Sequence, residues 1–216
     1  MKFWSLAIVA AMSAYGISPG ANARNITDQP GATFEQRRMP VQGVTEAPIG
    51  HVRFCYRYPE ECGEVDGGKS EVFLTTVRWA ELSSVNSRVN EMIKPVSDYI
   101  QYGTIEHWTY PTSGKGDCED YVLLKKRKLI DMGWPPAALL ITVVRDENDE
   151  GHAVLTVRTH RGDLVLDNKH SRILAWHNTP YTYIKRQSAF NKRNWDSLIP
   201  LGDTPAVAAS GADTRR

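Results

Sequence analysis

The sequence lacks a strong charge bias. Its 26 lysine and arginine residues nearly balance its 25 aspartate and glutamate residues, which leaves a formal net charge of +1. Nucleic-acid-binding chains normally carry an excess of basic residues, so nothing here favours a nucleic-acid partner. With 41% hydrophobic and 24% charged residues, the composition is that of a soluble globular protein of one or two domains.

The N-terminus lacks an apolar run long enough to span a membrane comfortably, which takes ~20 residues. A shorter run over residues 6–12 follows the positive charge of Lys2 and precedes the small residues Ala21 and Ala23. This order is typical of a secretory signal peptide. We therefore predict a signal peptide over residues 1–23, cleaved after Ala23. The mature protein is then periplasmic or secreted and does not span the membrane.

Cysteine is scarce, with only Cys55, Cys62 and Cys118 in the chain. In an oxidising compartment the close pair Cys55 and Cys62 can form a disulfide, which leaves Cys118 as an odd thiol. Such a thiol is either an inert buried side chain or a reactive one. Zinc-type spacing of histidine and cysteine is absent. The acidic run from Asp146 resembles an EF-hand loop at its start, but Val157 stands where that loop needs a bidentate glutamate.

Composition divides the mature chain into three parts. Residues 24–50 are rich in glycine, proline, glutamine and threonine, and we expect a loosely ordered lead-in, or strands and loops that cover the main domain. Residues 51–200 form the predicted main domain. Residues 201–216 are dominated by small and polar residues and are predicted to be disordered.

Two amphipathic helices are predicted in the first half of the main domain. Apolar residues recur at spacings of three and four over residues 79–102, where Pro95 is expected to kink or divide the helix. A second helix should start at Asp117, a good N-cap residue, with Asp120 as its capping-box partner. The basic run over residues 125–128 is expected to be a solvated face of that helix.

Four strands are predicted in the second half of the domain. They cover residues 138–145, 151–159, 163–168 and 181–187. A turn at residues 160–162 joins the second strand to the third as a hairpin. Helices followed by an antiparallel sheet indicate an α+β domain.

Cysteine, histidine and aspartate occupy positions that suit nucleophilic catalysis. Cys118 lies in the first turn of the second helix, where the helix dipole favours a thiolate. A hairpin turn centred near Thr159 and His160 gives pairs whose numbers sum to 319, so His152 faces Asp167 across the two strands. Directly opposed side chains lie ~5 Å apart at Cβ, which suits a base and the acid that orients it.

The same residues carry a resemblance to a known family. Gly-Asp-Cys-Glu-Asp-Tyr at residues 116–121, Gly-His-Ala-Val-Leu at 151–155 and Leu-Val-Leu-Asp-Asn at 164–168 resemble the bacterial transglutaminase-like cysteine peptidases. That family includes periplasmic proteases that process adhesins. The resemblance runs from about residue 85 to 195, and the part before it does not map onto the adhesin proteases.

The resemblance implies a fold, a reaction and partners. The fold is papain-like, with helices packed on an antiparallel sheet. The reaction is hydrolysis of peptide bonds by Cys118 as nucleophile, His152 as base and Asp167 as the orienting residue. The substrate is a protein such as a surface adhesin, and by analogy a membrane receptor regulates the enzyme.

Carboxylates surround the predicted nucleophile. Asp117, Glu119 and Asp120 should raise the pKa of the Cys118 thiol, because nearby negative charge disfavours an anion. A bound cation reverses that effect, and hard carboxylate oxygens suit Ca²⁺. The resemblance implies calcium dependence with Asp117 and Glu119 as ligands, whereas the alternative is that these acids only cap the helix.

Three functions therefore compete on the sequence alone. The first is a cysteine endopeptidase, and the second is acyl transfer to an amine by a transglutaminase or amidase with the same triad. The third is a non-catalytic, calcium-responsive binding module, against which the intact triad argues. For the oxyanion we consider the N–H of Cys118, and Trp108 by its position, although Trp108 also suits a core aromatic.

Overall fold

The computed structural model describes residues 37–65 and 68–200. The predicted signal peptide and C-terminal tail lie outside these residues, as does the first part of the predicted lead-in. Among the described helices, none has the length and apolar character that crossing a membrane requires.

A seven-stranded sheet in the order β1-β9-β8-β4-β5-β6-β7 forms the centre of the fold, and its paired strands are antiparallel. The strands are β1 Gly43–Thr45, β4 Leu139–Arg145, β5 Gly151–Thr159, β6 Gly162–Leu166, β7 Leu174–Ala175, β8 Thr182–Gln187 and β9 Trp195–Ser197. The four predicted strands correspond to β4, β5, β6 and β8. The other three have two or three residues each, too few for a periodic pattern.

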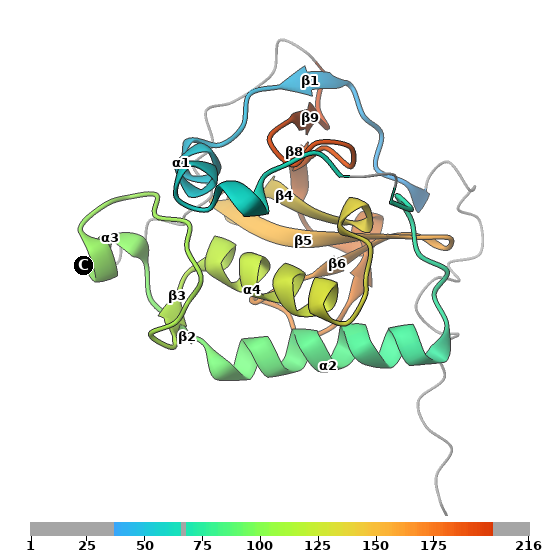
Figure 1. Ribbon diagram of the computed structural model, residues 1–216, viewed down its shortest axis with the longest axis horizontal. Helices are drawn as coiled ribbons and strands as arrows, with labels where there is room; N and C mark the ends of the chain where they lie inside the picture. Colours follow the sequence, from blue (N-terminus) through green and yellow to red (C-terminus); the bar gives the residue numbers. More distant parts are fainter. Residues whose placement is uncertain (1–36, 66–67, 201–216) are drawn as a thin grey trace, which may run out of the picture.

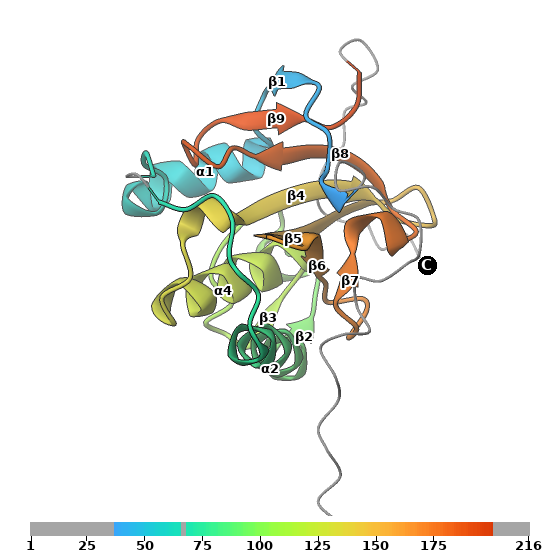
Figure 2. The ribbon, with the colours of Figure 1, turned by 90° about the vertical axis from the view of Figure 1, so that its right-hand side faces the viewer.

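Helices cover one face of this sheet (Figures 1 and 2). The α-helices of the described residues are α1 Ile49–Arg57, α2 Thr76–Met92, α3 Asp98–Tyr102 and α4 Cys118–Asp131. Short 3₁₀ turns lie at Pro59–Glu61, Pro136–Ala138 and Trp176–Asn178. Figure 2 shows α4 between the sheet and α2, in agreement with the contacts that α4 makes with β5 and with α2. The α+β class predicted from the sequence is confirmed.

Pro95 divides the first predicted helix in two. The chain leaves α2 at Met92 and forms β2 (Lys94–Pro95), which pairs in parallel with β3 (Lys115–Gly116) before α3 begins. Proline has no N–H to donate and clashes with the preceding helical turn, so the helix ends ahead of it. The β2–β3 pair brings the residues before α3 and those before α4 side by side.

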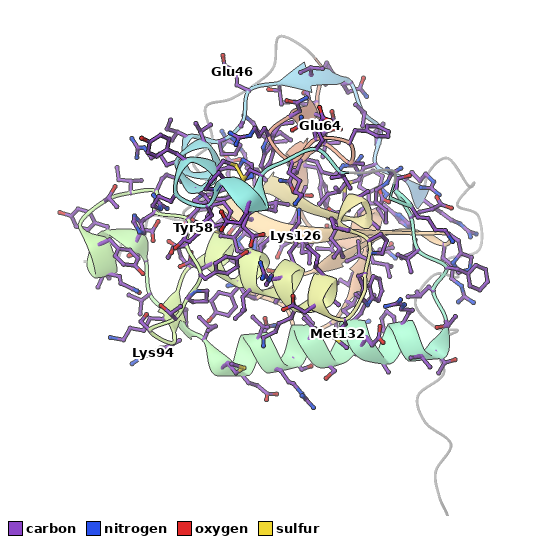
Figure 3. The ribbon with its side chains drawn as sticks, viewed as in Figure 1. Glu46, Tyr58, Glu64, Lys94, Lys126 and Met132 are labelled. Carbon is purple, nitrogen blue, oxygen red and sulfur yellow. A yellow bond between two sulfur atoms is a disulfide. The ribbon has the colours of Figure 1, made fainter. Side chains whose placement is uncertain are left out.

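The basic run on α4 was predicted to be solvated, and for Lys125 and Lys126 that prediction is wrong. Lys125 is fully buried, and Lys126 is buried with its ammonium donating to Gln187 Oε1 on β8 (Figure 3). Burial lowers the pKa of each of these two lysines to about 7. The reason is tertiary: α4 has the sheet on one side and α2 on the other, so it offers solvent a narrower face than a surface helix would.

The disulfide considered from the sequence is present. Cys55 of α1 and Cys62, the residue after the first 3₁₀ turn, form a disulfide with Cα atoms 5.4 Å apart. Since all three cysteines lie in the described residues, Cys118 is the one cysteine of the chain outside the disulfide.

Candidate active site

The β5–β6 hairpin carries the histidine and the aspartate, but its register differs from the predicted one. Thr159 pairs with Gly162 and Leu155 with Leu166, so paired numbers sum to 321 rather than 319. The centre of the turn therefore lies one residue further along the chain than predicted. Gly162 has φ 115°, and a Cβ added there would lie 2.6 Å from the backbone oxygen of Arg37. The glycine position therefore sets the turn.

This shift of two residues leaves the predicted pair on one face of the hairpin, whereas a shift of one would have separated it. His152 and Asp167 are diagonal neighbours instead of directly opposed. Their side chains still meet, with His152 Nε2 2.8 Å from Asp167 Oδ1, and both residues are buried. The structure thus brings together two of the three predicted catalytic residues in a direct side-chain contact.

Several donors hold Asp167, which directly follows β6. The Tyr181 hydroxyl donates to Oδ2, and the N–H of Lys169 donates to Oδ1 at 3.0 Å. Asn90 of α2 donates to the backbone carbonyl of Asp167 at 2.8 Å. Burial acts to raise the pKa of Asp167, but the hydrogen bonds from His152, Tyr181 and Lys169 outweigh it and lower that pKa to about 2. The carboxylate is therefore ionised and fixed in direction.

Cys118 is the first residue of α4, and it is 6% exposed. Asp117 occupies the predicted N-cap position, but its side chain makes no cap hydrogen bond to α4 and its Oδ2 accepts the N–H of Asp98 at 3.1 Å. The backbone N–H of Ala153 faces the Cys118 sulfur and acts to lower the pKa of the thiol. Because Ala153 directly follows His152 in β5, the thiol lies against the part of the strand that carries the predicted base.

The thiol is protonated in this arrangement. Cys118 donates to Glu119 Oε2 at a sulfur–oxygen distance of 3.0 Å. Burial raises the pKa of the thiol well above its usual value, and the negative charges of Glu119 and Asp117 raise it further. The direction agrees with the effect expected from the neighbouring carboxylates.

The carboxylates form a cluster with a member that sequence reasoning missed. Asp98, Asp117 and Glu119 each offer an oxygen within 4.8 Å of the others. Burial and then the Asp117 charge raise the pKa of Asp98 to about 7, and burial also raises the pKa values of Asp117 and Glu119. Asp98 was missed because it is distant in sequence and reaches the cluster only through the β2–β3 pair.

This cluster suits a hard divalent cation. Asp117 Oδ1 and Glu119 Oε1 are buried and accept no hydrogen bond. Such orphaned carboxylate oxygens are costly to bury, and a cation held by oxygen ligands would satisfy them. A second group, His51 with Cys55 and Cys62, has its sulfur atoms joined in the disulfide.

Asp120 and Trp108 are both buried, and each makes a hydrogen bond. Asp120 Oδ1 accepts the N–H of Thr109 at 2.8 Å, and a Cβ on Gly116 would lie 2.5 Å from Asp120 Oδ2, so glycine is required there. Trp108 is fully buried, and its indole N–H donates to Glu106 Oε2 at 2.8 Å. The indole is therefore a core aromatic whose donor is already used, which removes it as an oxyanion candidate.

A thiol at the start of a helix and a histidine–carboxylate pair on an antiparallel sheet are features typical of α+β cysteine proteinases. The chain belongs to the bacterial transglutaminase-like cysteine proteinase family, whose sequence model matches residues 41–201. It is thus a cysteine proteinase by family. Comparison with proteins of curated function gave no match.

Solved structures of LapG from Legionella pneumophila are similar to this chain. The EGTA-treated form is 28% identical over 50% of this chain and 62% of its own, with a TM-score of 0.45. A second LapG structure is 28% identical over 51% and 64%, with a TM-score of 0.46. The calcium-bound form is 25% identical over 60% and 74%, with a TM-score of 0.48. The chain spans less than two thirds of the length of the first two.

Proposed function

We propose that this chain is an exported cysteine endopeptidase that cleaves a surface or periplasmic protein. Cys118 is its nucleophile, His152 its base and Asp167 the residue that orients the base. One observation carries the proposal: His152 of β5 makes a buried side-chain contact with Asp167, and the backbone N–H of Ala153, the residue after His152, faces the Cys118 sulfur and acts to lower the pKa of the thiol.

The proton path follows from which histidine nitrogen binds the carboxylate. Asp167 holds Nε2, so Nδ1 is the nitrogen that takes the thiol proton. The Cys118 sulfur then attacks the carbonyl carbon of the peptide bond, and the C=O electron pair moves onto oxygen. When the tetrahedral species collapses, the C–N bond breaks and the imidazolium gives its proton to the leaving amine.

The second half of the reaction releases the acyl group from the thioester. Water attacks the thioester carbonyl as His152 accepts its proton, and the C–S bond breaks to return the thiol and a carboxylic acid. In both halves the N-terminus of α4, with the N–H of Cys118 in its first turn, favours negative charge on the carbonyl oxygen. Asp167 stays ionised throughout and stabilises the imidazolium.

Calcium binding is the second part of the proposal. Asp98, Asp117 and Glu119 would hold the ion, and LapG, which this chain resembles, has been solved in a calcium-bound form. A cation there would supply positive charge beside the thiol, opposing the carboxylates that raise its pKa. Glu119 accepts a hydrogen bond from the Cys118 thiol. If Glu119 bound a cation instead, the thiol proton would be available for transfer to His152.

Export and partners belong to the proposal as well. The order of charge, apolar run and small residues over residues 1–23 supports export. A surface adhesin as substrate and a membrane receptor as regulator are proposed from the family resemblance alone.

Replacing His152 with glutamine tests the base. Because Cys118 is the one cysteine outside the disulfide, its alkylation by an electrophilic peptide chloromethyl ketone is measured directly by mass spectrometry. Without His152, no base accepts the proton of the Cys118 thiol. We therefore expect the alkylation rate to fall about 100-fold or more.

The matched control is His177→Gln, at an exposed histidine in the third 3₁₀ turn. This variant should label at the wild-type rate. Equal labelling of the His152→Gln variant and the wild type would remove His152 from the mechanism.

A further inference from the structure

Tyr181 contacts both members of the histidine–aspartate pair. It directly precedes β8 and is 8% exposed. Its hydroxyl donates to Asp167 Oδ2, the carboxylate oxygen that does not bind His152. Its ring meets the His152 ring edge-on, with centroids 5.7 Å apart and planes at 69°. One side chain therefore touches the carboxylate and the imidazole at once.

The other groups near Asp167 do not duplicate this contact. Lys169 donates its backbone N–H to Oδ1, the oxygen shared with His152, and Asn90 binds the backbone carbonyl of Asp167. Lys125, buried on α4, acts on Asp167 by its charge. Tyr181 supplies the donor for Oδ2. Burial, and then the hydrogen bond to Asp167, raise the pKa of the Tyr181 hydroxyl, so it stays protonated as a donor.

Loss of that donor would free the carboxylate to turn. A buried carboxylate oxygen without a partner carries a desolvation penalty. Rotation about the Cβ–Cγ bond of Asp167 would let Oδ2 compete for the partners of Oδ1, which are His152 Nε2 and the Lys169 N–H. The imidazole would then lose the fixed direction that proton transfer requires.

We propose that Tyr181 is a positioning residue of the catalytic site, which fixes the Asp167 carboxylate through a hydrogen bond to Oδ2 and packs against the His152 ring. Tyr181 acts through these two residues and needs no contact with substrate. The inference rests on the proposed function and deepens it.

The chain offers a matched control two residues away. Tyr183 lies in β8 and is 7% exposed, and its hydroxyl hydrogen-bonds with Thr179 Oγ1 at 2.9 Å, whereas the Tyr181 hydroxyl donates to Asp167. Its ring contacts Trp176. Tyr181→Phe and Tyr183→Phe therefore delete the same atom from equally buried rings, and only the first deletion removes a hydrogen bond to the catalytic pair.

The test measures alkylation of Cys118 by iodoacetamide in the mature chain with calcium, as a function of pH. For Tyr181→Phe we expect a rate about 10- to 100-fold lower, the effect of losing one hydrogen bond to a charged group. The hydroxyl helps to lower the pKa of Asp167. In the variant Asp167 should therefore become protonated at a higher pH than in the wild type. The pH below which the alkylation rate falls should rise accordingly.

Rates are taken per folded molecule, with the folded fraction measured by circular dichroism, so that partial unfolding does not imitate the effect. A proton NMR signal from His152 Nε2–H should also move in Tyr181→Phe and stay in place in Tyr183→Phe. Wild-type rates and an unmoved signal in Tyr181→Phe would overturn the inference. Equal losses in both variants with an unchanged pH profile would do so too, because they would show a structural role only.

Failure of the proposed function would look different. If His152→Gln labelled as fast as the wild type, the triad itself would be wrong. If that variant were slow while Tyr181→Phe behaved as the wild type, the triad would stand and only the role of Tyr181 would fall.

Discussion

Cells that carry Cys118→Ala should fail to release the cleavage products that the wild-type protein generates from an envelope or surface protein. Alanine leaves no atom to form the thioester, and triad nucleophiles of this kind are worth ~10⁴-fold or more in rate. Cys118 is buried at the first position of α4, where alanine is well tolerated. Comparative proteomics of envelope and secreted fractions, with wild type against variant, measures the result and identifies the substrate.

The other two cysteines supply the control. A Cys55→Ala/Cys62→Ala double variant removes the disulfide between α1 and the following turn but keeps Cys118. It should lose ~2–4 kcal/mol of stability at most and still produce the cleavage fragments at a temperature where it remains folded. Identical fragment patterns from Cys118→Ala and the wild type would refute the endopeptidase assignment.

Calcium should stabilise the fold, and Asp98→Asn should change that response in two opposite ways. Without calcium, the substitution removes one negative charge from a buried acidic cluster, so the variant should melt higher than the wild type. With calcium, the variant lacks a charged ligand and should gain less. For the wild type we expect calcium in excess over its dissociation constant to contribute ~2–3 kcal/mol, or about 4–10 °C in melting temperature.

The pH dependence of the chelated protein gives a second readout. Asp98 has a pKa of about 7 in the fold and about 3.9 in an unfolded chain. A raised folded pKa means that the stabilisation is present below about pH 4 and is lost as the pH rises through about 7. In EGTA, the wild type should therefore melt at a lower temperature at about pH 8 than at about pH 5, and Asp98→Asn should show less of this loss.

Asp131→Asn is the control for this series. Asp131 lies at the end of α4 with a side chain that is 61% exposed and paired with Arg127, so its substitution should leave the calcium response unchanged. The same samples allow Cys118 alkylation to be compared with and without EGTA. Equal melting temperatures and equal alkylation rates in calcium and in EGTA would remove calcium from the account.

Local pattern was enough to predict the elements that carry the site. Runs of β-branched and other apolar residues predicted β4, β5, β6 and β8. Asp117, a residue type that favours the N-cap, predicted the start of α4. Hairpin geometry alone put His152 and Asp167 on one face. The register itself was predicted two residues off, because a strand repeats every two residues and only Gly162 with its positive φ defines where the turn lies.

Other features had no local signal. Lys125 and Lys126 are buried because α4 packs against the sheet on one side and α2 on the other. The sequence of a basic run is the same whether its helix is packed on one side or on two. Tyr181 was predicted as the start of a strand, but its partner Asp167 directly follows β6, and β4 and β5 lie between β8 and β6 in the sheet.

By itself, the sequence determined the residue types of the site, the helix that presents Cys118 and the hairpin that pairs a histidine with a carboxylate. Short-range backbone preferences and side-chain periodicity decide these features, and both depend only on residues close together in the sequence. The tertiary structure decided which carboxylates share a site with Cys118, which hydroxyl holds Asp167 and which lysines are buried. Those features depend on contacts between segments far apart in the chain, and such contacts exist only once the sheet and the helices have packed.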